Sequence, residues 1–425
     1  MTIKLGVIAD DFTGATDIAS FMVQSGWQVV QLLVTPDENT DIPQDIDAIV
    51  ISLKSRSCPV DKAVNNSLKS CRWLRQKASC QQIFFKYCST FDSTNTGNIG
   101  PVTDALMSEL SADLTLICPA LPVNGRTVVH GHLFVNGRLL NESGMQHHPV
   151  TPMKDANLIR LMEQQAQGKA GLVDLACVHQ GEQAIRKQLN NLQQQGIRYA
   201  VVDAISMNDL LPIANAVSEL TLVTGGSGLG AALASTNTGK SLTPFQSAGA
   251  IPPAQNRRTV ILSGSCSVMT NKQVAQYQKL APTKSLDIRL CLHDPQYAGQ
   301  LVEWIMQQSE NNLAPMLYST QLAETLQKIQ QQYGATTASE AIESTFSSVV
   351  KSLKQRGFNT FIIAGGETAG KIVQSLDIQQ FNIGAPIAPG VPWVHDLQHN
   401  HWLALKSGNF GDINFFLHAQ EMFYE

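Results

Sequence analysis

Short apolar runs alternate with longer amphipathic segments over most of the chain. The short runs are typical of buried strands, and the segments with apolar residues three and four positions apart are typical of helices. The predicted strands are 3–8, 28–34, 48–53, 82–87, 114–118, 172–176, 199–203, 259–262, 285–290, 315–319, 360–364 and 402–406. The predicted helices are 12–25, 60–77, 101–110, 180–196, 268–279 and 339–356. This alternation predicts an α/β fold with mainly parallel sheets.

The composition changes once along the chain, after residue 243. Pro244, Gly249, Pro252 and Pro253 fall in a stretch of small and polar residues, and a new strand–helix pattern starts after it. At 425 residues the chain is also too long for one ordinary core. We therefore predict two α/β domains, 1–243 and 259–425, joined by a linker at 244–258.

Composition and charge narrow the class of protein. Apolar residues make up 43% of the chain and charged ones 15%, and the net charge is −4 with no basic run, which argues against a nucleic-acid partner. No apolar run reaches the roughly 18 residues that span a bilayer, and the first residues lead straight into a strand, without a signal peptide. Eight scattered cysteines without CxxC pairs suit reduced thiols. We expect a cytoplasmic enzyme that binds no membrane. The sequence does not decide whether the enzyme forms a homo-oligomer.

The end of the first predicted strand carries two adjacent carboxylates, Asp10 and Asp11, followed by Thr13 and Gly14. Ligands of open α/β sheets bind at the carboxyl ends of the strands. Asp11 or Thr13 could simply cap the following helix. Two neighbouring like charges, however, need a cation or a hydrogen-bonding ligand to offset them, so we interpret this turn as part of a site.

Polar residues also follow the next strands of the N-terminal domain. Arg56 stands just past the strand 48–53, where it could hold a carboxylate with two parallel hydrogen bonds or make a surface ion pair. Lys86 ends the strand 82–87, and Asp92 lies in the hydroxyl- and amide-rich stretch 89–100, which precedes a helix N-terminus. This stretch is either a polar surface loop or a cradle for a polyhydroxylated anion, and we favour the cradle.

Arg126 and His130 follow the strand 114–118, and His132 completes a His-x-His pair. Two histidines can ligate a metal, but no cysteine or acidic partner stands at a familiar spacing. We therefore expect these histidines to orient a ligand or to satisfy a local hydrogen bond, and no metal ligand is assigned.

Three turns of the C-terminal domain are rich in Gly and Ser, and each directly follows a strand: 263–267, 365–370 and 407–411. Such turns can be tight without any ligand, but three on one sheet edge favour a phosphate cradle and so a nucleotide site. The Gly-rich turn at 225–230 has neither the dinucleotide fingerprint nor a P-loop lysine. The missing fingerprint argues against a nicotinamide-dependent dehydrogenase. A non-catalytic sensor of a polyhydroxylated anion would need neither the paired Asp10 and Asp11 nor the three phosphate-type turns.

With these motifs the chain resembles the four-carbon acid sugar kinase family. The resemblance rests on the following segments: Ala-Asp-Asp-Phe-Thr-Gly-Ala-Thr-Asp at 9–17, 86–100, 118–137, Leu-Ser-Gly-Ser-Cys-Ser at 262–267, Ala-Gly-Gly-Glu-Thr-Ala-Gly at 364–370, and Lys-Ser-Gly-Asn-Phe-Gly at 406–411. They stand in the family's order and span nearly the whole chain.

The resemblance implies an N-terminal acid-sugar domain, a C-terminal nucleotide domain and an active site in the interdomain cleft. ATP would phosphorylate the C4 hydroxyl of a 3-oxo-tetronate, or of a threonate- or erythronate-type acid, with Mg²⁺ expected at the phosphates. The implied ATP contacts are Ser263, Gly365, Gly366, Glu367, Thr368 and Gly408. Our candidates for orienting or deprotonating the hydroxyl are Asp11 and Asp92. Our candidates for substrate binding are Asp10, Thr13, Arg56, Lys86, Arg126 and His130.

Overall fold

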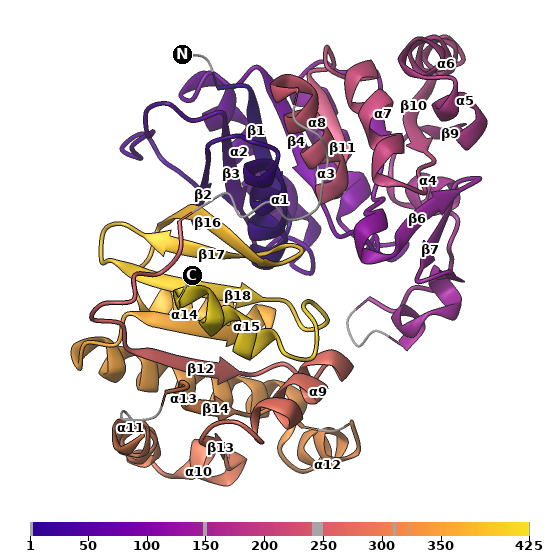
Figure 1. Ribbon diagram of the computed structural model, residues 1–425. Helices are drawn as coiled ribbons and strands as arrows, with labels where there is room; N and C mark the ends of the chain where they lie inside the picture. Colours follow the sequence, from indigo (N-terminus) through magenta and orange to yellow (C-terminus); the bar gives the residue numbers. More distant parts are fainter. Residues whose placement is uncertain (1–2, 148–150, 240–249, 309–311, 322, 425) are drawn as a thin grey trace. The chain divides into compact units, whose positions relative to one another are not determined.

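The structure is a computed structural model that describes residues 3–147, 151–239, 250–308, 312–321 and 323–424. The chain divides into two compact units, Met1–Gln246 and Ser247–Glu425. Part of the predicted linker, 244–249, lies outside the described residues, as do the neighbouring positions 240–243. Figure 1 shows the helices and strands of both units, coloured along the sequence.

A five-stranded parallel sheet forms the centre of the first unit, in the order β11-β4-β1-β3-β2. Its strands are β1 (Leu5–Ala9), β2 (Val29–Leu32), β3 (Ala48–Ser52), β4 (Gln82–Lys86) and β11 (Leu222–Gly225). The helices that follow these strands in the chain are α1 (Phe12–Gln24), α2 (Val60–Gln76), α3 (Ile99–Glu109) and α8 (Ser227–Thr238). Nearly all residues of these strands are buried, as expected for a parallel sheet.

Two smaller sheets complete the first unit. One is parallel, in the order β5 (Thr115–Ile117), β10 (Ile197–Val202) and β9 (Lys169–Val173). The other is antiparallel, in the order β6 (Arg126–Val129), β7 (His132–Val135) and β8 (Arg138–Leu139). The accompanying helices are α4 (Leu158–Gln165), α5 (Leu175–His179), α6 (Glu182–Gln194) and α7 (Leu210–Ala216).

The second unit contains a seven-stranded mixed sheet in the order β16-β17-β18-β15-β12-β14-β13. Its strands are β12 (Thr259–Ser263), β13 (Thr283–Ser285), β14 (Met316–Tyr318), β15 (Thr360–Ala364), β16 (Gln380–Ala388), β17 (Val391–Asp396) and β18 (His401–Lys406). The pairs β16–β17 and β17–β18 are antiparallel and the others parallel. Its helices are α9 (Val268–Tyr277), α10 (Ile288–His293), α11 (Tyr297–Gln307), α12 (Ala323–Tyr333), α13 (Ala335–Gln355), α14 (Gly366–Ser375) and α15 (Phe415–Glu421).

Two of the predicted strands are wrong over part of their length. The strand expected at 172–176 ends at Val173, because Asp174 accepts a hydrogen bond from the Cys177 N–H at 2.8 Å and starts α5. The strand expected at 285–290 is mainly helix α10, which Asp287 caps in the same way. In both places an N-cap overrides the strand propensity of the apolar residues around it.

The register of the parallel strands brings their carboxyl ends to one edge in each unit. In the first unit Ala9 pairs with Ser52 and with Lys86, which itself pairs with Gly225. In the second unit Ala364 pairs with Ser263 and with Lys406. The prediction that three Gly/Ser turns share one sheet edge is thus confirmed. Among the described helices, none has the length and apolar character needed to cross a membrane.

Candidate functional site

A guanidinium lies between two carboxylates at the edge of the first sheet. Arg56 donates through Nε and Nη2 to the two oxygens of Asp10, both at 2.9 Å, and through Nη2 to Asp11 at 2.8 Å. Backbone hydrogen bonds fix this arrangement, because the N–H groups of Ser55 and Arg56 both donate to the carbonyl of Asp10. The arginine therefore offsets the like charges that the sequence places side by side.

The pKa values of the two carboxyl groups are shifted in opposite directions. Burial raises the pKa of Asp10, against the opposing effect of Arg56. Burial acts on Asp11 in the same sense, but Arg56, Lys86 and two hydrogen bonds outweigh it and hold the pKa of Asp11 below its ordinary value. Those hydrogen bonds come from the Thr13 hydroxyl and the Gly14 N–H, each at 3.0 Å. Asp11 is thus both the N-cap of α1 and a member of the cluster whose ionised form its neighbours stabilise.

Asp92 reaches the same guanidinium from the 89–100 stretch. Its Oδ2 lies 3.7 Å from Arg56 Nη1, and its Oδ1 accepts from the Thr90 hydroxyl at 2.6 Å. Asn98 secures the backbone that carries the arginine, since its Nδ2 donates to the carbonyls of Ser55 and Cys58 at 2.7 and 2.9 Å. The structure therefore brings Asp10, Asp11, Arg56 and Asp92 together.

Further along, the 89–100 stretch borders a cavity of about 390 Å³. The cavity is lined by Ser93, Thr94, Asn95, Thr96, Pro152, Met153, Lys154, Asp155, Leu161 and Gln164. The hydroxyls and amides that suggested a cradle thus face a hollow whose charged members are Lys154 and Asp155.

A second buried group of charges surrounds Asp17. Lys86 is only 3% exposed and lies so close above Gly14 that a Cβ there would come within 2.3 Å of its Nζ. Burial raises the pKa of Asp17 to about 6, and Lys86 and Arg126 act in the opposite direction. Ser227, the first residue of α8, donates its hydroxyl to Asp17 Oδ2.

Two atoms of this group are buried and have no hydrogen-bond partner in the described structure. They are Asp17 Oδ1, which can only accept a hydrogen bond when ionised, and Arg126 Nε, which can only donate one. Buried polar groups are almost always satisfied, so such a pair needs an explanation.

His130 contributes its backbone rather than its ring. The residue is exposed, and its N–H donates to Asp203 Oδ2 at 2.8 Å, while the Gly131 N–H donates to Asp203 Oδ1 at 2.9 Å. Asp203 is fully buried and also accepts from the Leu175 N–H, so it fixes the turn between β6 and β7. The ring of His130 is not part of the Asp10–Arg56 cluster.

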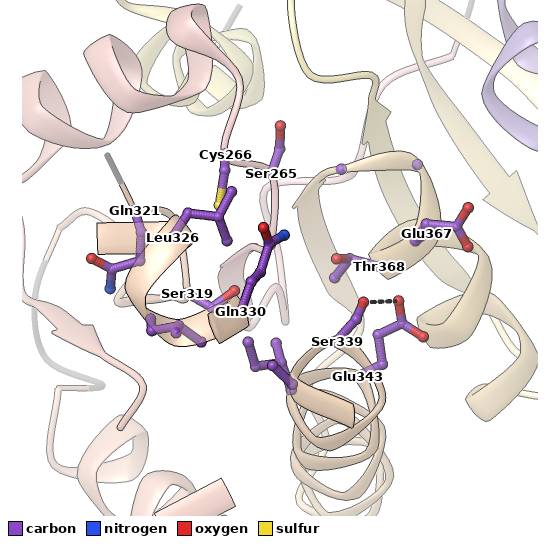
Figure 2. Close-up of a pocket in the computed structure, with 16 residues that line it drawn as sticks. Ser265, Cys266, Ser319, Gln321, Leu326, Gln330, Ser339, Glu343, Glu367 and Thr368 are labelled. Atoms are coloured by element: carbon purple, nitrogen blue, oxygen red, sulfur yellow. Dashed lines mark hydrogen bonds between the residues drawn. The ribbon is translucent and has the colours of Figure 1, made fainter. Parts of the chain in front are cut away.

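In the second unit a cavity of about 270 Å³ lies against the Gly/Ser turns (Figure 2). One side consists of the turns 264–266 and 365–368, and the other carries the apolar side chains Leu326, Ile329, Ala338 and Ile342. None of the described lining residues is a lysine or an arginine; the acidic ones are Glu343 and Glu367. A polar end and an apolar end in one cavity suit a phosphate chain and a base, respectively.

The turns fit one another closely. Gly365 has a φ of +121°, and a Cβ there would lie 3.1 Å from the Ser265 nitrogen. A glycine is therefore required for both conformation and space. Gly365 is also the N-cap of α14 and offers no side chain to its first N–H groups, which leaves them available to an anion.

The third turn is held by a fully buried lysine. Lys406 Nζ donates to Thr270 Oγ1 and to the carbonyls of Ser407 and Gly408, at 3.0, 3.0 and 2.8 Å. Burial lowers the pKa of Lys406 to about 7, whereas its three acceptors favour the charged form. The Gly408 carbonyl also accepts from the hydroxyls of Ser267 and Thr270.

The predicted ATP residues are not all equivalent. Gly365, Gly366, Glu367 and Thr368 line the cavity. Ser263 is buried, with its hydroxyl 2.7 Å from that of Thr320, and Gly408 packs against Ser265 and Ser267. These two residues lie beside the lining rather than in it.

The site residues predicted from the sequence do not include Asp17, Ser227 or Lys406. Asp17 stands one helical turn after Thr13 and Gly14, so the 3.6-residue period could have placed it on the same face of α1. Lys406 is the only charged residue in the strand His401–Lys406 apart from any charge on His401. Lysines are rarely buried unless they are paired, so a lysine at the end of an apolar strand could have indicated a functional or structural role.

Comparison with known proteins agrees with this division of the chain. A family model described as a sugar-binding N-terminal domain matches residues 5–233, and one described as a nucleotide-binding C-terminal domain matches residues 260–416. A 3-oxo-tetronate kinase of Brucella melitensis biotype 1 is 52% identical over 422 residues, which cover 99% of this chain and 95% of that protein. One from Escherichia coli K12 is 51% identical over 390 residues, or 91% of this chain and 99% of that protein.

Solved structures agree as well. A crystal structure of a Salmonella typhimurium LT2 protein has a TM-score of 0.89 and 51% identity, and the match covers 99% of each chain. That of Haemophilus influenzae protein HI1011 has a TM-score of 0.81 and 51% identity, covering 98% of this chain and 100% of that one. The chain therefore belongs to the four-carbon acid sugar kinase family.

Proposed function

We propose that the protein transfers the γ-phosphoryl group of ATP to the C4 hydroxyl of a 3-oxo-tetronate. The proposal is supported by its similarity, over nearly its whole length, to proteins of that activity. Threonate- or erythronate-type acids are the alternative substrates. The reducing cytoplasm is the expected compartment, in keeping with eight unpaired cysteines.

The observation that carries the substrate half of the proposal is the unsatisfied pair near Lys86. Asp17 Oδ1 needs a donor and Arg126 Nε needs an acceptor, and both are buried. A hydroxy acid supplies both, because its hydroxyl can donate to Asp17 while its carboxylate accepts from Arg126. Lys86 lies close enough to lower the pKa of Asp17 and adds the positive charge that a carboxylate requires.

Arg56 then has a more limited contact with the substrate than the sequence suggests. Two of its nitrogens are already taken up by Asp10 and Asp11, so a substrate oxygen would bind at Nη1, on the side of Asp92. Its main task is to hold the two carboxylates in position. We keep Asp11 and Asp92 as the groups that orient or deprotonate the attacking hydroxyl; a loose phosphoryl-transfer transition state asks mainly for orientation.

ATP would bind in the cavity of the second unit. The phosphates would face the N-terminus of α14 and the turn 264–266, and the base would pack on Leu326, Ile329 and Ile342. Since no lysine or arginine lines the described cavity, Mg²⁺ is the expected source of positive charge. Glu367, exposed at the N-terminus of α14, offers the oxygen ligand that Mg²⁺ prefers. When bound, the ion would neutralise charge on the phosphates.

A coupled assay for ADP tests the proposal, with Mg·ATP and a panel of four-carbon acids and their 3-oxo forms. ADP formation should depend on the added acid, and a 3-oxo-tetronate should give the highest kcat/KM. Turnover limited to threonate or erythronate would change the substrate but keep the kinase. An absence of acid-dependent ADP with every member of the panel would contradict the proposal. The predicted cleft between the domains stays a prediction.

A further inference from the structure

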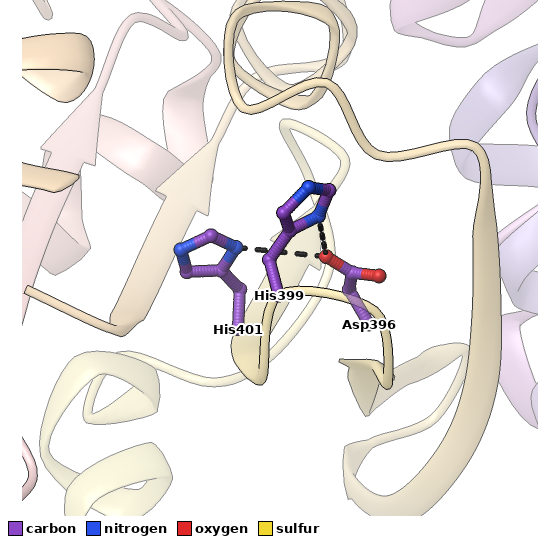
Figure 3. Close-up of side chains that lie close together, drawn as sticks. All are labelled: Asp396, His399 and His401. Carbon is purple, nitrogen blue, oxygen red and sulfur yellow. Dashed lines mark hydrogen bonds and ion pairs between the residues drawn. The ribbon is translucent and has the colours of Figure 1, made fainter.

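An aspartate and two histidines lie together at the turn between β17 and β18, in the second unit (Figure 3). Asp396 ends β17, His401 begins β18, and His399 lies in the turn between them. One ligand atom from each residue can be chosen so that all three lie within 4.8 Å of one another. Asp396 and His401 are 3% and 4% exposed, whereas His399 is half-buried.

Hydrogen bonds explain only part of this cluster. Asp396 Oδ1 accepts from the Gln398 N–H at 3.1 Å, and Oδ2 is 2.8 Å from His399 Nδ1. His401 Nδ1 is buried and has no hydrogen-bond partner in the described structure. Its nearest acidic atom is Asp396 Oδ2 at 3.6 Å, which is too far for a hydrogen bond. A buried imidazole nitrogen is thus directed at a carboxylate without bonding to it.

The spacing and chemistry of these atoms suit a metal ion. Ligands 2.0–2.2 Å from a tetrahedral zinc lie roughly 3.3–3.6 Å apart, as His401 Nδ1 and Asp396 Oδ2 do. His399 Nδ1 lies 2.8 Å from the same oxygen, so an ion would replace this hydrogen bond and move the two atoms apart. Two imidazoles and one carboxylate are donors for zinc, cobalt or nickel, whereas Mg²⁺ and Ca²⁺ prefer oxygen ligands throughout. We propose that Asp396, His399 and His401 bind one divalent transition-metal ion, Zn²⁺ foremost, with water completing its coordination.

The position of the cluster separates it from the nucleotide site. β18 begins at His401 and ends at Lys406, and the Ser407–Gly408 turn follows that far end. An ion at the cluster would join the two antiparallel strands at the opposite end of β18. The site is therefore structural: it would fasten the β17–β18 turn and leave phosphoryl transfer to the other sheet edge.

The neighbouring charges set a limit on affinity. The ammonium of Lys354 acts on His401 electrostatically, but it donates to the Leu376 carbonyl at 2.9 Å and is held there. An ion would face this positive charge as well as the negative charge of Asp396. We therefore expect a site that a strong chelator empties without unfolding the protein.

The test uses untagged, full-length protein that has been stripped with chelator and titrated with ZnCl₂ or CoCl₂. Wild type should bind one ion per chain competitively with a chromophoric chelator, give Co²⁺ visible absorption bands, and gain thermal stability with Zn²⁺. His399→Ala is the main variant, because His399 is half-buried and its loss should leave the fold intact. It should lower metal affinity by more than about 100-fold, since changes outside the ligand set already cost 10- to 100-fold. Excess Mg²⁺ should not displace the ion.

His418→Ala is the matched control. His418 also stands beside an aspartate, Asp412, at 3.3 Å, but has no third ligand in the described structure. This variant should bind zinc as wild type does. Equal zinc affinity in His399→Ala and wild type, or no competition with the chelator in wild type, would overturn the proposal and leave a hydrogen-bonded turn. Mg·ATP-dependent kinase activity should persist in His399→Ala, so this test is independent of the proposed function.

Discussion

Arg56 donates to both carboxylate oxygens of Asp10, each at 2.9 Å, and thereby grips a carboxylate that is almost completely buried. The grip is planar and two-pronged, a geometry that a lysine ammonium cannot reproduce. Removal of this geometry leaves a desolvated charge with poorer hydrogen bonds. We therefore expect the pair to stabilise the first unit and to align Asp11 beside it.

Arg56→Lys should raise the KM for the sugar acid by about tenfold or more, because Nη1 is absent from lysine and the carboxylates lose their fixed positions. The free energy of unfolding should fall by about 1–3 kcal/mol. Steady-state kinetics and denaturant unfolding measure the two effects. The matched control is Arg72→Lys, which alters an equally two-pronged but exposed pair with Glu109 and should be silent. An unchanged KM would make Arg56 a purely structural residue.

Asp11→Asn separates capping from chemistry. Asparagine caps a helix about as well as aspartate, so α1 should stay intact. The charge beside Arg56 is lost, and kcat should fall by roughly 10²-fold or more if Asp11 orients or deprotonates the hydroxyl. Asp92→Asn and Asp10→Asn are measured in parallel. A fully active Asp11→Asn enzyme would transfer the role to Asp92.

Gly365→Ala should weaken ATP binding by at least about tenfold, because the new methyl group meets the Ser265 nitrogen and displaces the turn. Isothermal titration calorimetry with ATP measures the loss, and binding of the sugar acid should survive. Gly357→Ala is the matched control: it also has a positive φ, +84°, but the nearest atom to its Cβ is 4.0 Å away. It should lose stability yet bind ATP normally. Normal ATP affinity in Gly365→Ala would remove this turn from the site.

Asp17 should make stability depend on pH in a defined window. Its folded pKa is raised to about 6 from an ordinary value of 3.8, so the folded protein binds the extra proton. That contribution is complete below 3.8 and is lost as the pH rises through 6. Between pH 5 and 8 the loss should be about 1 kcal/mol. Urea unfolding should detect it in wild type and not in Asp17→Asn; the same slope in both would assign it to another group.

Lys406→Met should raise the KM for ATP and leave the KM for the acid unchanged, because the variant removes the three hydrogen bonds that Lys406 donates to Thr270, Ser407 and Gly408. An ammonium has three protons for these acceptors and an amine only two. The KM of wild type for ATP should therefore rise as the pH increases through the lowered pKa of about 7. Lys279→Met, at an exposed lysine, is the control. A pH-independent KM in wild type would argue against the tether.

The residues whose position at one sheet edge could be predicted from the sequence are those at strand ends. Asp10, Lys86 and the three Gly/Ser turns could be predicted because parallel strands bring their carboxyl ends to one edge. Arg126 acts electrostatically on Asp17 although the two residues stand far apart in the chain, and no local pattern encodes that proximity. The strands β16 and β17 carry prolines and glycines that hide their pairing, so the Asp396–His401 cluster could not be foreseen either.

In the turns that line the cavity of the second unit, the Thr368 side chain occupies the space that a side chain at Gly264 would need. A Cβ at position 264 would lie 2.0 Å from Thr368 Oγ1. A side chain at position 264 would thus require the Thr368 side chain to move or to be shortened. We therefore expect the two positions, far apart in the chain, to vary together among related proteins.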